Sequence, residues 1–259
     1  MNANVRSIFV LTGLTLSLAA QAEDAGPSAT PYRPSVSAPA AMSEPGWLDL
    51  ELGTQRNKGG GDKYRDSLPA AAKLAFNKDW GLVLNGELAV RRTDTDGNVF
   101  SGVGDVTAQL KHRIASADDA TAWGWSAGVK LPSAKDSIGS GKSDLLLNGI
   151  FSSDFAGDNH IDANLGLTRL GAIGPGEGRW QLGWAAAVSH TLNDQWSLFA
   201  EPSGTYRKAV PTTSQLMVGA AYNYSKRAVF DIALARGLTN ATPDWQLQAG
   251  VTLLLAKLW

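Results

Sequence analysis

The end of the chain constrains the fold most, because its polarity alternates up to a terminal aromatic residue. Apolar side chains recur at every second position from Leu247 to Leu255, glycine and glutamine occupy positions in the other phase, and the last residue is Trp259. Strands of membrane barrels show this pattern because lipid-facing and lumen-facing side chains alternate and aromatic residues gather at the interfaces. Lys257 departs from it in the apolar phase, where its stem can lie along apolar surface while its ammonium reaches the headgroups.

The first 22 residues have the features of an export signal. Arg6 precedes an apolar stretch, and Ala20-Gln21-Ala22 forms a small-x-small cleavage site. We therefore expect residues 1–22 to be a signal peptide; an uncleaved anchor helix is the alternative, although the stretch is short for a full span. Residues 23–45 are rich in Pro, Ala and Ser, which predicts a semi-extended, largely disordered periplasmic linker.

Composition excludes several classes of protein. Without residues 1–22, whose only charged residue is Arg6, Lys and Arg fall from 23 to 22 against 24 acidic residues, so a nucleic-acid partner is not indicated. The chain contains no cysteine. After the signal, no stretch approaches the ~18 consecutive apolar residues of a membrane helix, so any span must consist of strands.

Period-2 alternation bounded by Gly, Pro, Asn or Asp recurs from residue 46 to residue 259. It predicts an all-β fold, an antiparallel transmembrane β-barrel of about 12 strands in residues 46–259. The expected strands are 47–53, 67–77, 80–93, 102–114, 122–132, 143–154, 160–169, 179–191, 196–206, 213–224, 228–236 and 244–259.

The connections fall into two alternating classes. One class is mostly short, as in 77–79 and 193–195, whereas the other tends to be longer and richer in Gly and charge, as in 54–66 with Gly59-Gly60-Gly61. Short periplasmic turns and longer outer loops are typical of outer-membrane barrels. The pattern predicts the outer membrane of a Gram-negative cell, with both termini periplasmic. Tryptophans should then form half of an aromatic belt at the short-turn rim: Trp47, Trp80, Trp123, Trp196 and Trp259.

Charged residues are confined to one phase of the strands, which we expect to face the lumen because Lys or Arg on a lipid face near midplane costs ~2–4 kcal/mol. A soluble barrel would have the opposite orientation. Carboxylates in a narrow lumen need basic partners. They form either a charged constriction that selects permeants or a structural network that plugs the lumen. The candidates are Glu87, Arg91, Asp105, Lys111, Arg113, Lys130, Asp144 and Glu201.

Three segments carry a resemblance to a known family: Gly102-Val103-Gly104-Asp105-Val106 continuing to Lys111, Val129-Lys130-Leu131-Pro132 continuing through Gly139-Ser140-Gly141 to Ser143-Asp144, and Trp196-Ser197-Leu198-Phe199-Ala200-Glu201. They resemble the outer-membrane β-barrel family named for the meta-pathway of phenol degradation (MetA-pathway), whose members are described as transporters. The chain departs from the family's Pro-Thr-Gly segment, because Ser133 and Ala134 follow Pro132. The resemblance implies a barrel of this size that passes hydrophobic or aromatic compounds, and it implies no catalytic residue.

The sequence thus predicts an outer-membrane channel for passive passage of small molecules. The expected partners are outer-membrane lipid, a small-molecule permeant and, during biogenesis, the outer-membrane assembly machinery. We expect no enzyme activity, no cofactor and no metal, since His112, His160 and His190 lack a nucleophilic serine at a recognisable spacing. Three alternatives remain: a structural or adhesion barrel that acts through its outer loops, a membrane-embedded hydrolase, and a soluble periplasmic sandwich.

Overall fold

The computed structural model describes residues 26–115 and 120–259, and all the regular elements in this part of the chain are strands. The predicted signal peptide lies outside the described residues. Among the described residues, none forms a helix long and apolar enough to cross a membrane. The strands are β1 (Trp47–Gly59), β2 (Asp62–Ala75), β3 (Trp80–Thr93), β4 (Val99–Gly102), β5 (Val106–Ala115), β6 (Thr121–Leu131), β7 (Asp144–Phe155), β8 (Asn159–Arg169), β9 (Trp180–Thr191), β10 (Trp196–Arg207), β11 (Val210–Ser225), β12 (Ala228–Gly237) and β13 (Trp245–Lys257).

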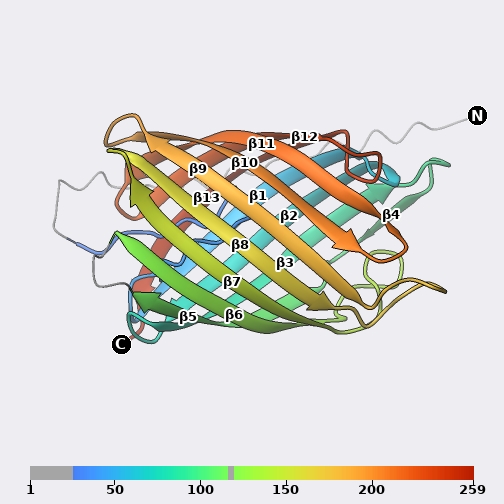
Figure 1. The fold of residues 1–259 in the computed structure, drawn as a ribbon, viewed down its shortest axis with the longest axis horizontal. Coiled ribbons are helices and arrows are strands. Elements are labelled where there is room, and N and C mark those ends of the chain that lie inside the picture. The colour runs from blue at the N-terminus through green and yellow to red at the C-terminus, as the bar shows by residue number, and fades with distance from the viewer. Residues whose placement is uncertain (1–25, 116–119) are drawn as a thin grey trace, which may run out of the picture.

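The strands close into an antiparallel barrel, as Figure 1 shows. Apart from β4 and β5, which both pair with β3, strands that are consecutive in the chain pair with one another. The ring closes where β1 pairs with β13, from Trp47 opposite Lys257 to Lys58 opposite Trp245. The predicted fold class is confirmed: the barrel has 12 strands, because β4 and β5 together occupy a single position.

A short break separates β4 from β5. Both pieces pair with β3, with Gly102 opposite Val90 and Thr107 opposite Asn85, so they keep one register. Across the break only the Gly104 N–H donates to the Glu87 carbonyl, at 2.8 Å. Gly104 is needed there because a Cβ would lie 2.8 Å from the Cβ of Glu87. The expected strand 102–114 is therefore real but interrupted.

The two faces of the wall have the polarity that the alternation predicts. Leu88 and Leu165 on the outside are 61% and 60% exposed, whereas Lys111 and Glu201 on the inside are 1% and 0% exposed. A soluble barrel would bury its leucines and expose its charges. The structure therefore contradicts the soluble sandwich and confirms the lumen-facing polar phase.

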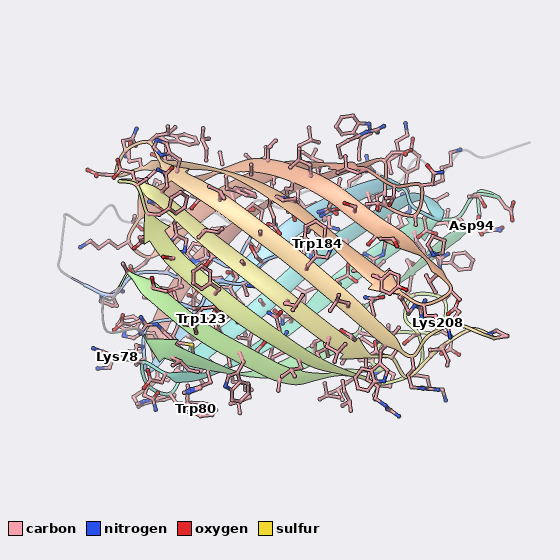
Figure 2. All side chains as sticks on the ribbon, viewed as in Figure 1. Lys78, Trp80, Asp94, Trp123, Trp184 and Lys208 are labelled. Atoms are coloured by element: carbon pink, nitrogen blue, oxygen red, sulfur yellow. The ribbon has the colours of Figure 1, made fainter. Side chains whose placement is uncertain are left out.

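The barrel has a turn end and a loop end. At the turn end, Leu258 donates to the carbonyl of Gly46 at 2.7 Å, and Figure 2 shows Trp80 and Trp123 near Lys78 at this end, opposite Asp94 and Lys208 at the loop end. Trp80 stacks on His112 with ring centroids 4.1 Å apart. The predicted tryptophan rim is present at the turn end.

One predicted outer loop is a tight hairpin instead. Residues 54–66 were expected to form a loop, but β1 continues to Gly59 and β2 starts at Asp62, and Arg56 faces Asp66 across the ladder. The three glycines make the turn possible because each has a positive φ, from 75° to 101°. The connection at Lys208-Ala209 is equally short. Loop length therefore alternates only in part.

Candidate functional site

Residues 26–45, here called the inner segment, lie along the inner wall of the barrel. The Thr30 N–H donates to Asp49 Oδ2 at 3.1 Å, and the Tyr32 N–H donates to Glu51 Oε1 at 2.6 Å. This corrects the expectation of a disordered linker outside the barrel. Proline-rich chain makes few hydrogen bonds with itself, but the wall supplies partners for its remaining N–H and C=O groups.

From β1 the inner segment follows the wall around the barrel. Glu201 on β10 accepts from the N–H of Val36 at 2.9 Å and from the N–H of Ser37 at 3.0 Å. Asn164 on β8 accepts from the Ala38 N–H at 2.8 Å and donates to the Ala38 carbonyl at 2.9 Å. These contacts come in the order in which β1, β10 and β8 stand around the barrel.

Lys111 on β5 holds the returning part of the segment. Its ammonium donates to the carbonyls of Pro39 and Ala41 at 2.6 and 2.7 Å and to the Tyr32 hydroxyl at 2.5 Å. The segment then closes on itself, because the Thr30 hydroxyl donates to the carbonyl of Met42 at 3.3 Å. The inner segment thus completes a circuit of the lumen.

Tyr32 occupies a site between two buried lysines. The Lys73 and Lys111 ammonium groups lie 4.3 and 4.2 Å from its ring centroid, within the range of cation–π attraction. Lys73 also pairs with Glu51 at 2.7 Å and Asp49 at 3.4 Å. Burial, reinforced by the charges of Glu51 and Asp49, raises the pKa of the Tyr32 phenol, so the hydroxyl stays protonated.

Arg33 lies in a cradle formed by two glycines. Its guanidinium pairs with Asp231 on β12 at 3.4 Å and donates to the Ala249 carbonyl at 3.3 Å. A Cβ on Gly250 would stand 2.5 Å from Arg33 Nε, and a Cβ on Gly53 would collide with the guanidinium carbon. The wall therefore has no side chain where the arginine passes.

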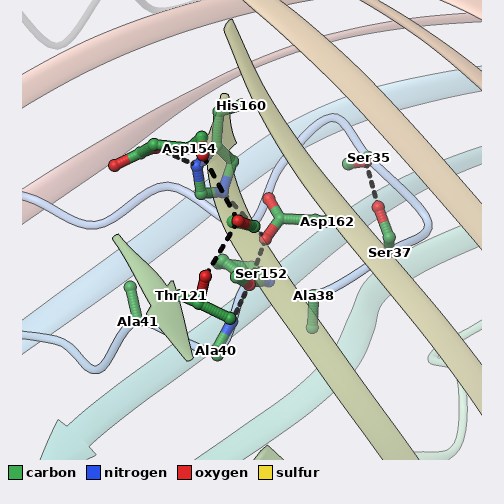
Figure 3. Close-up of polar contacts among 12 residues, drawn as sticks. Ser35, Ser37, Ala38, Ala40, Ala41, Thr121, Ser152, Asp154, His160 and Asp162 are labelled. Atoms are coloured by element: carbon green, nitrogen blue, oxygen red, sulfur yellow. Dashed lines mark hydrogen bonds and ion pairs between the residues drawn. The ribbon is translucent and has the colours of Figure 1, made fainter. Parts of the chain in front are cut away.

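A chain of polar groups links the inner segment to the turn end, as Figure 3 shows. The Ala40 N–H donates to the Ser152 hydroxyl at 2.7 Å, and that hydroxyl donates to Asp162. His160 lies 3.1 Å from Asp162 through Nε2 and 2.5 Å from Asp154 through Nδ1. A catalytic serine needs a base at its hydroxyl, but Asp162 stands between Ser152 and His160. This arrangement anchors the segment and does not form a nucleophilic triad.

A cavity of about 470 Å³ lies beside the inner segment on its loop-end side. On β8, Asn164 contacts the segment, and the next inward residues, Gly166 and Thr168, line the cavity. We call it the chamber. Its apolar lining includes Val36, Pro69, Val83, Leu146 and Ile150, and its uncharged polar lining includes Asn85, Gln109, Ser126, Asn148 and Thr205.

Three charged residues line the chamber, and each is bound to another group. Arg33 pairs with Asp231, Glu51 pairs with Lys73, and Lys111 donates to the inner segment. The chamber is therefore a mainly uncharged space. No group of three or more His, Cys, Asp or Glu that could hold a metal occurs among residues 26–115 and 120–259.

Beyond the chamber, the predicted charged residues at the loop end pair with one another. Lys130 lies 3.3 Å from Asp105 and 2.8 Å from Asp144. Glu87 forms a two-pronged pair with Arg65, with both distances 2.6 Å. These contacts join neighbouring strands and do not involve the inner segment.

The eight predicted residues thus divide into groups. Lys111 and Glu201 bind the inner segment, whereas Glu87, Asp105, Lys130 and Asp144 form loop-end ion pairs. The expectation that Arg91 faces the lumen is wrong: the register shifts between Ser67 and Pro69, so Val90, which is 2% exposed, faces inward and Arg91 lies exposed on the outer face, opposite Asp66. Arg113 is half-buried near the turn end. The role of these eight residues in selecting permeants stays a prediction.

Sequence reasoning missed most of the residues that hold the segment: Tyr32, Arg33, Asp49, Glu51, Lys73 and Asp231. The alternation could have placed Asp49, Glu51 and Lys73 in the lumen, because they share the polar phase of their strands. No local signal places Tyr32 and Arg33 there.

The sequence matches no protein-family profile and no curated protein. By fold, it is similar to several solved structures. The COG4313 outer membrane channel from Pseudomonas putida F1 matches with a TM-score of 0.65 at 12% identity, over 91% of this chain and 100% of that chain. The NanC porin matches with a TM-score of 0.57 at 11% identity, over 80% and 100% of the two chains. The CymD monoaromatic hydrocarbon channel matches with a TM-score of 0.50 at 9% identity, over 83% and 90%.

These identities are low, so the likeness concerns the fold. The match over 91% of the chain includes residues that precede Gly46, since residues 46–259 alone make up a smaller share. The similar structures are barrels described as outer-membrane channels and porins.

Proposed function

We propose that this protein is a channel in the outer membrane of a Gram-negative cell, through which small uncharged molecules, hydrophobic or aromatic, pass by diffusion. The observation that carries the proposal is the chamber, a mainly uncharged cavity of about 470 Å³ inside a barrel whose outer surface is apolar. The likeness to outer-membrane channels, one of them a monoaromatic hydrocarbon channel, supports it.

The residues on the outer surface of the barrel support the membrane location. Exposed leucines cover the middle of the wall, and tryptophans mark its ends, with Trp80 and Trp196 at the turn end and Trp180 and Trp245 at the loop end. Aromatic belts on both sides of an apolar band are typical of a barrel in lipid. We assign the turn end to the periplasm, because Gly46 and Trp259 meet there, and the loop end to the outside.

The nature of the permeant follows from the chamber. A charged molecule would lose water and find no free counter-ion, since Arg33, Glu51 and Lys111 are already bound. An uncharged ring could lie against Leu146 and Ile150, while a hydroxyl or carbonyl group could bond to Asn148. The chamber therefore favours neutral molecules over ions of the same size.

Uptake by intact cells tests this preference. Cells that lack the protein are compared with complemented cells for uptake of benzyl alcohol, benzoate and benzylammonium. Because an unpaired buried ion costs more than ~1.4 kcal/mol, complementation should increase benzyl alcohol uptake at least ~10-fold more than uptake of the two ions. Equal gains for all three solutes would contradict the selectivity.

A matched pair of variants tests whether permeants pass through the chamber. Gly183 lines the chamber and a Cβ there would meet nothing within 4 Å, so Gly183→Leu should fill part of the cavity and reduce uptake. Gly149→Leu, on the outer face of β7, is the control and should leave uptake unchanged. If the purified barrel shows no conductance in planar bilayers and complementation changes no uptake, the protein is a non-transporting structural or adhesion barrel.

A further inference from the structure

The inner wall recognises the main chain of the inner segment. Carboxylates of Asp49, Glu51 and Glu201 accept from backbone N–H groups of the segment, at distances from 2.6 to 3.1 Å. Asn164 pairs with both the N–H and the carbonyl of Ala38. These contacts go to the backbone of the segment, and serine hydroxyls add to them, since Ser35 donates to Glu201 and Ser43 donates to Asp49 at 3.3 Å.

Wall donors complete the pattern on the carbonyl side. Lys111 donates to the carbonyls of Pro39 and Ala41, and Gln248 donates to the carbonyl of Pro34 at 2.7 Å. Lys73 donates to the carbonyl of Thr30. Prolines lack an N–H, so the segment brings fewer donors into the lumen than another chain of its length.

The barrel closes without the help of the segment. Every strand of the described wall except the short β4, which pairs with β3 alone, pairs with a neighbour on each side around the ring, whereas the segment joins the ladder only through the bridge between Pro45 and Ala75. If the segment left, water could solvate the wall carboxylates and ammonium groups. The segment therefore occupies the lumen as a ligand occupies a preformed binding site.

Two side chains fix the register of this ligand. Tyr32 lies between the ammonium groups of Lys73 and Lys111, and the neighbouring Arg33 reaches Asp231 across Gly53 and Gly250. A shift by one residue would remove both contacts. The site thus combines general recognition of backbone with specific recognition of one aromatic residue followed by arginine.

We propose that the lumen is a binding site for proline-containing peptides that carry an aromatic residue followed by arginine, and that the inner segment is its covalently attached occupant. An unattached peptide of this class binds when the attached segment is weakened. In the unmodified chain the segment competes at the millimolar effective concentration that a short tether provides. This inference does not depend on whether the barrel conducts.

The test uses the full chain carrying Tyr32→Ala and Arg33→Ala, folded in detergent, with a fluorescein-labelled synthetic peptide of residues 26–45 in the native sequence. Fluorescence anisotropy should show at least ~10-fold tighter binding to this variant than to the unmodified chain, whose site is occupied. A second labelled peptide with both alanine substitutions should bind the variant at least ~10-fold more weakly than the native peptide.

A substitution in the inner wall then tests whether the peptide binds in the lumen. Asp231→Asn, added to the weakened chain, should reduce binding of the native peptide and leave binding of the alanine peptide unchanged, whereas the loop-end control Asp105→Asn should change neither. A heat-modifiable gel shift verifies that each barrel is folded. If the Asp231→Asn variant fails to fold, the difference in binding between the native and alanine peptides is sufficient to test the proposal.

The proposal is overturned if the folded, weakened chain binds no native peptide up to millimolar concentration, or binds the native and alanine peptides equally well. Because anisotropy measures binding and not transport, a failure of the channel function would leave these results intact.

Discussion

The two halves of the lumen use the same kinds of charged side chain in different ways. Towards the turn end, Lys111 and Glu201 bind the inner segment and are 1% and 0% exposed. Towards the loop end, the Lys130 side chain is 20% exposed and pairs with Asp105, in the break between β4 and β5, and with Asp144 on β7. An inward-facing charge therefore does not by itself indicate selection of a permeant, because its partner decides what it does.

The partner of each charge sets the consequence of its removal. Removal of one partner from a buried, hydrogen-bonded charge costs ~3–5 kcal/mol. The Lys130, Asp105 and Asp144 side chains are also largely buried, at 20%, 11% and 10% exposed, but they pair with one another and not with the inner segment. Substitutions at the turn end should therefore disturb the inner segment strongly, and equivalent substitutions at the loop end should leave it in place.

Lys111→Met should have the largest effect. It removes the donor to Pro39, Ala41 and Tyr32, and each hydrogen bond to a charged group contributes ~1.5–3 kcal/mol. We expect the segment to leave the wall and single-channel conductance to rise at least ~10-fold in planar bilayers. Lys130→Met, on the neighbouring strand β6, is the matched control. Equal conductance of the two variants would remove the distinction between the two halves.

Glu201→Gln should loosen the middle of the segment. The amide keeps one acceptor oxygen, but the two backbone N–H groups of Val36 and Ser37 lose a charged partner. We expect chymotrypsin to cleave after Tyr32 at least ~5-fold faster than in the unmodified chain, for a loss of ~1 kcal/mol. Glu87→Gln at the loop end should leave this cleavage rate unchanged. Protection of Tyr32 in both variants would argue against Glu201 as an anchor.

Gly53→Ala tests the cradle of Arg33. The new methyl group collides with the guanidinium carbon, and the flexible side chain should move away from Asp231. Since only the end of a side chain must shift, we expect a loss of ~0.5 kcal/mol, seen as an increase of ~2-fold in cleavage after Tyr32. Gly183→Ala adds the same methyl group where nothing lies within 4 Å and should have no such effect.

Arg56→Ala should have the smallest effect. The Arg56 and Asp66 side chains pair at 2.6 Å but are 65% and 34% exposed, in the part of the β1–β2 hairpin near the loop end. An exposed pair contributes ~0–1 kcal/mol, so the temperature of the heat-modifiable gel shift should fall by no more than a few degrees, with conductance unchanged. A change in conductance here would mean that the loop end also controls passage.

The sequence by itself predicted the barrel and the orientation of its wall. Period-2 alternation is a local property, so residues such as Lys111 and Glu201 could be assigned to the lumen without knowledge of the fold. Most strand bounds agree within a few residues, as in β3 (Trp80–Thr93). The hairpin around Gly60 was missed because a strand's length depends on pairing with its neighbours, here β13 beside β1.

Only the tertiary structure decided what the lumen contains. The proline-rich composition of residues 23–45 is typical of a linker, yet Arg33 of this stretch pairs with Asp231, which is 198 residues away in the chain. Hydrogen bonds between the backbone of one segment and side chains spread over the barrel leave no periodic pattern in the sequence. The alternation determined which residues face the lumen, and closure of the barrel determined that several of them meet the inner segment, because closure brings distant strands around one narrow space.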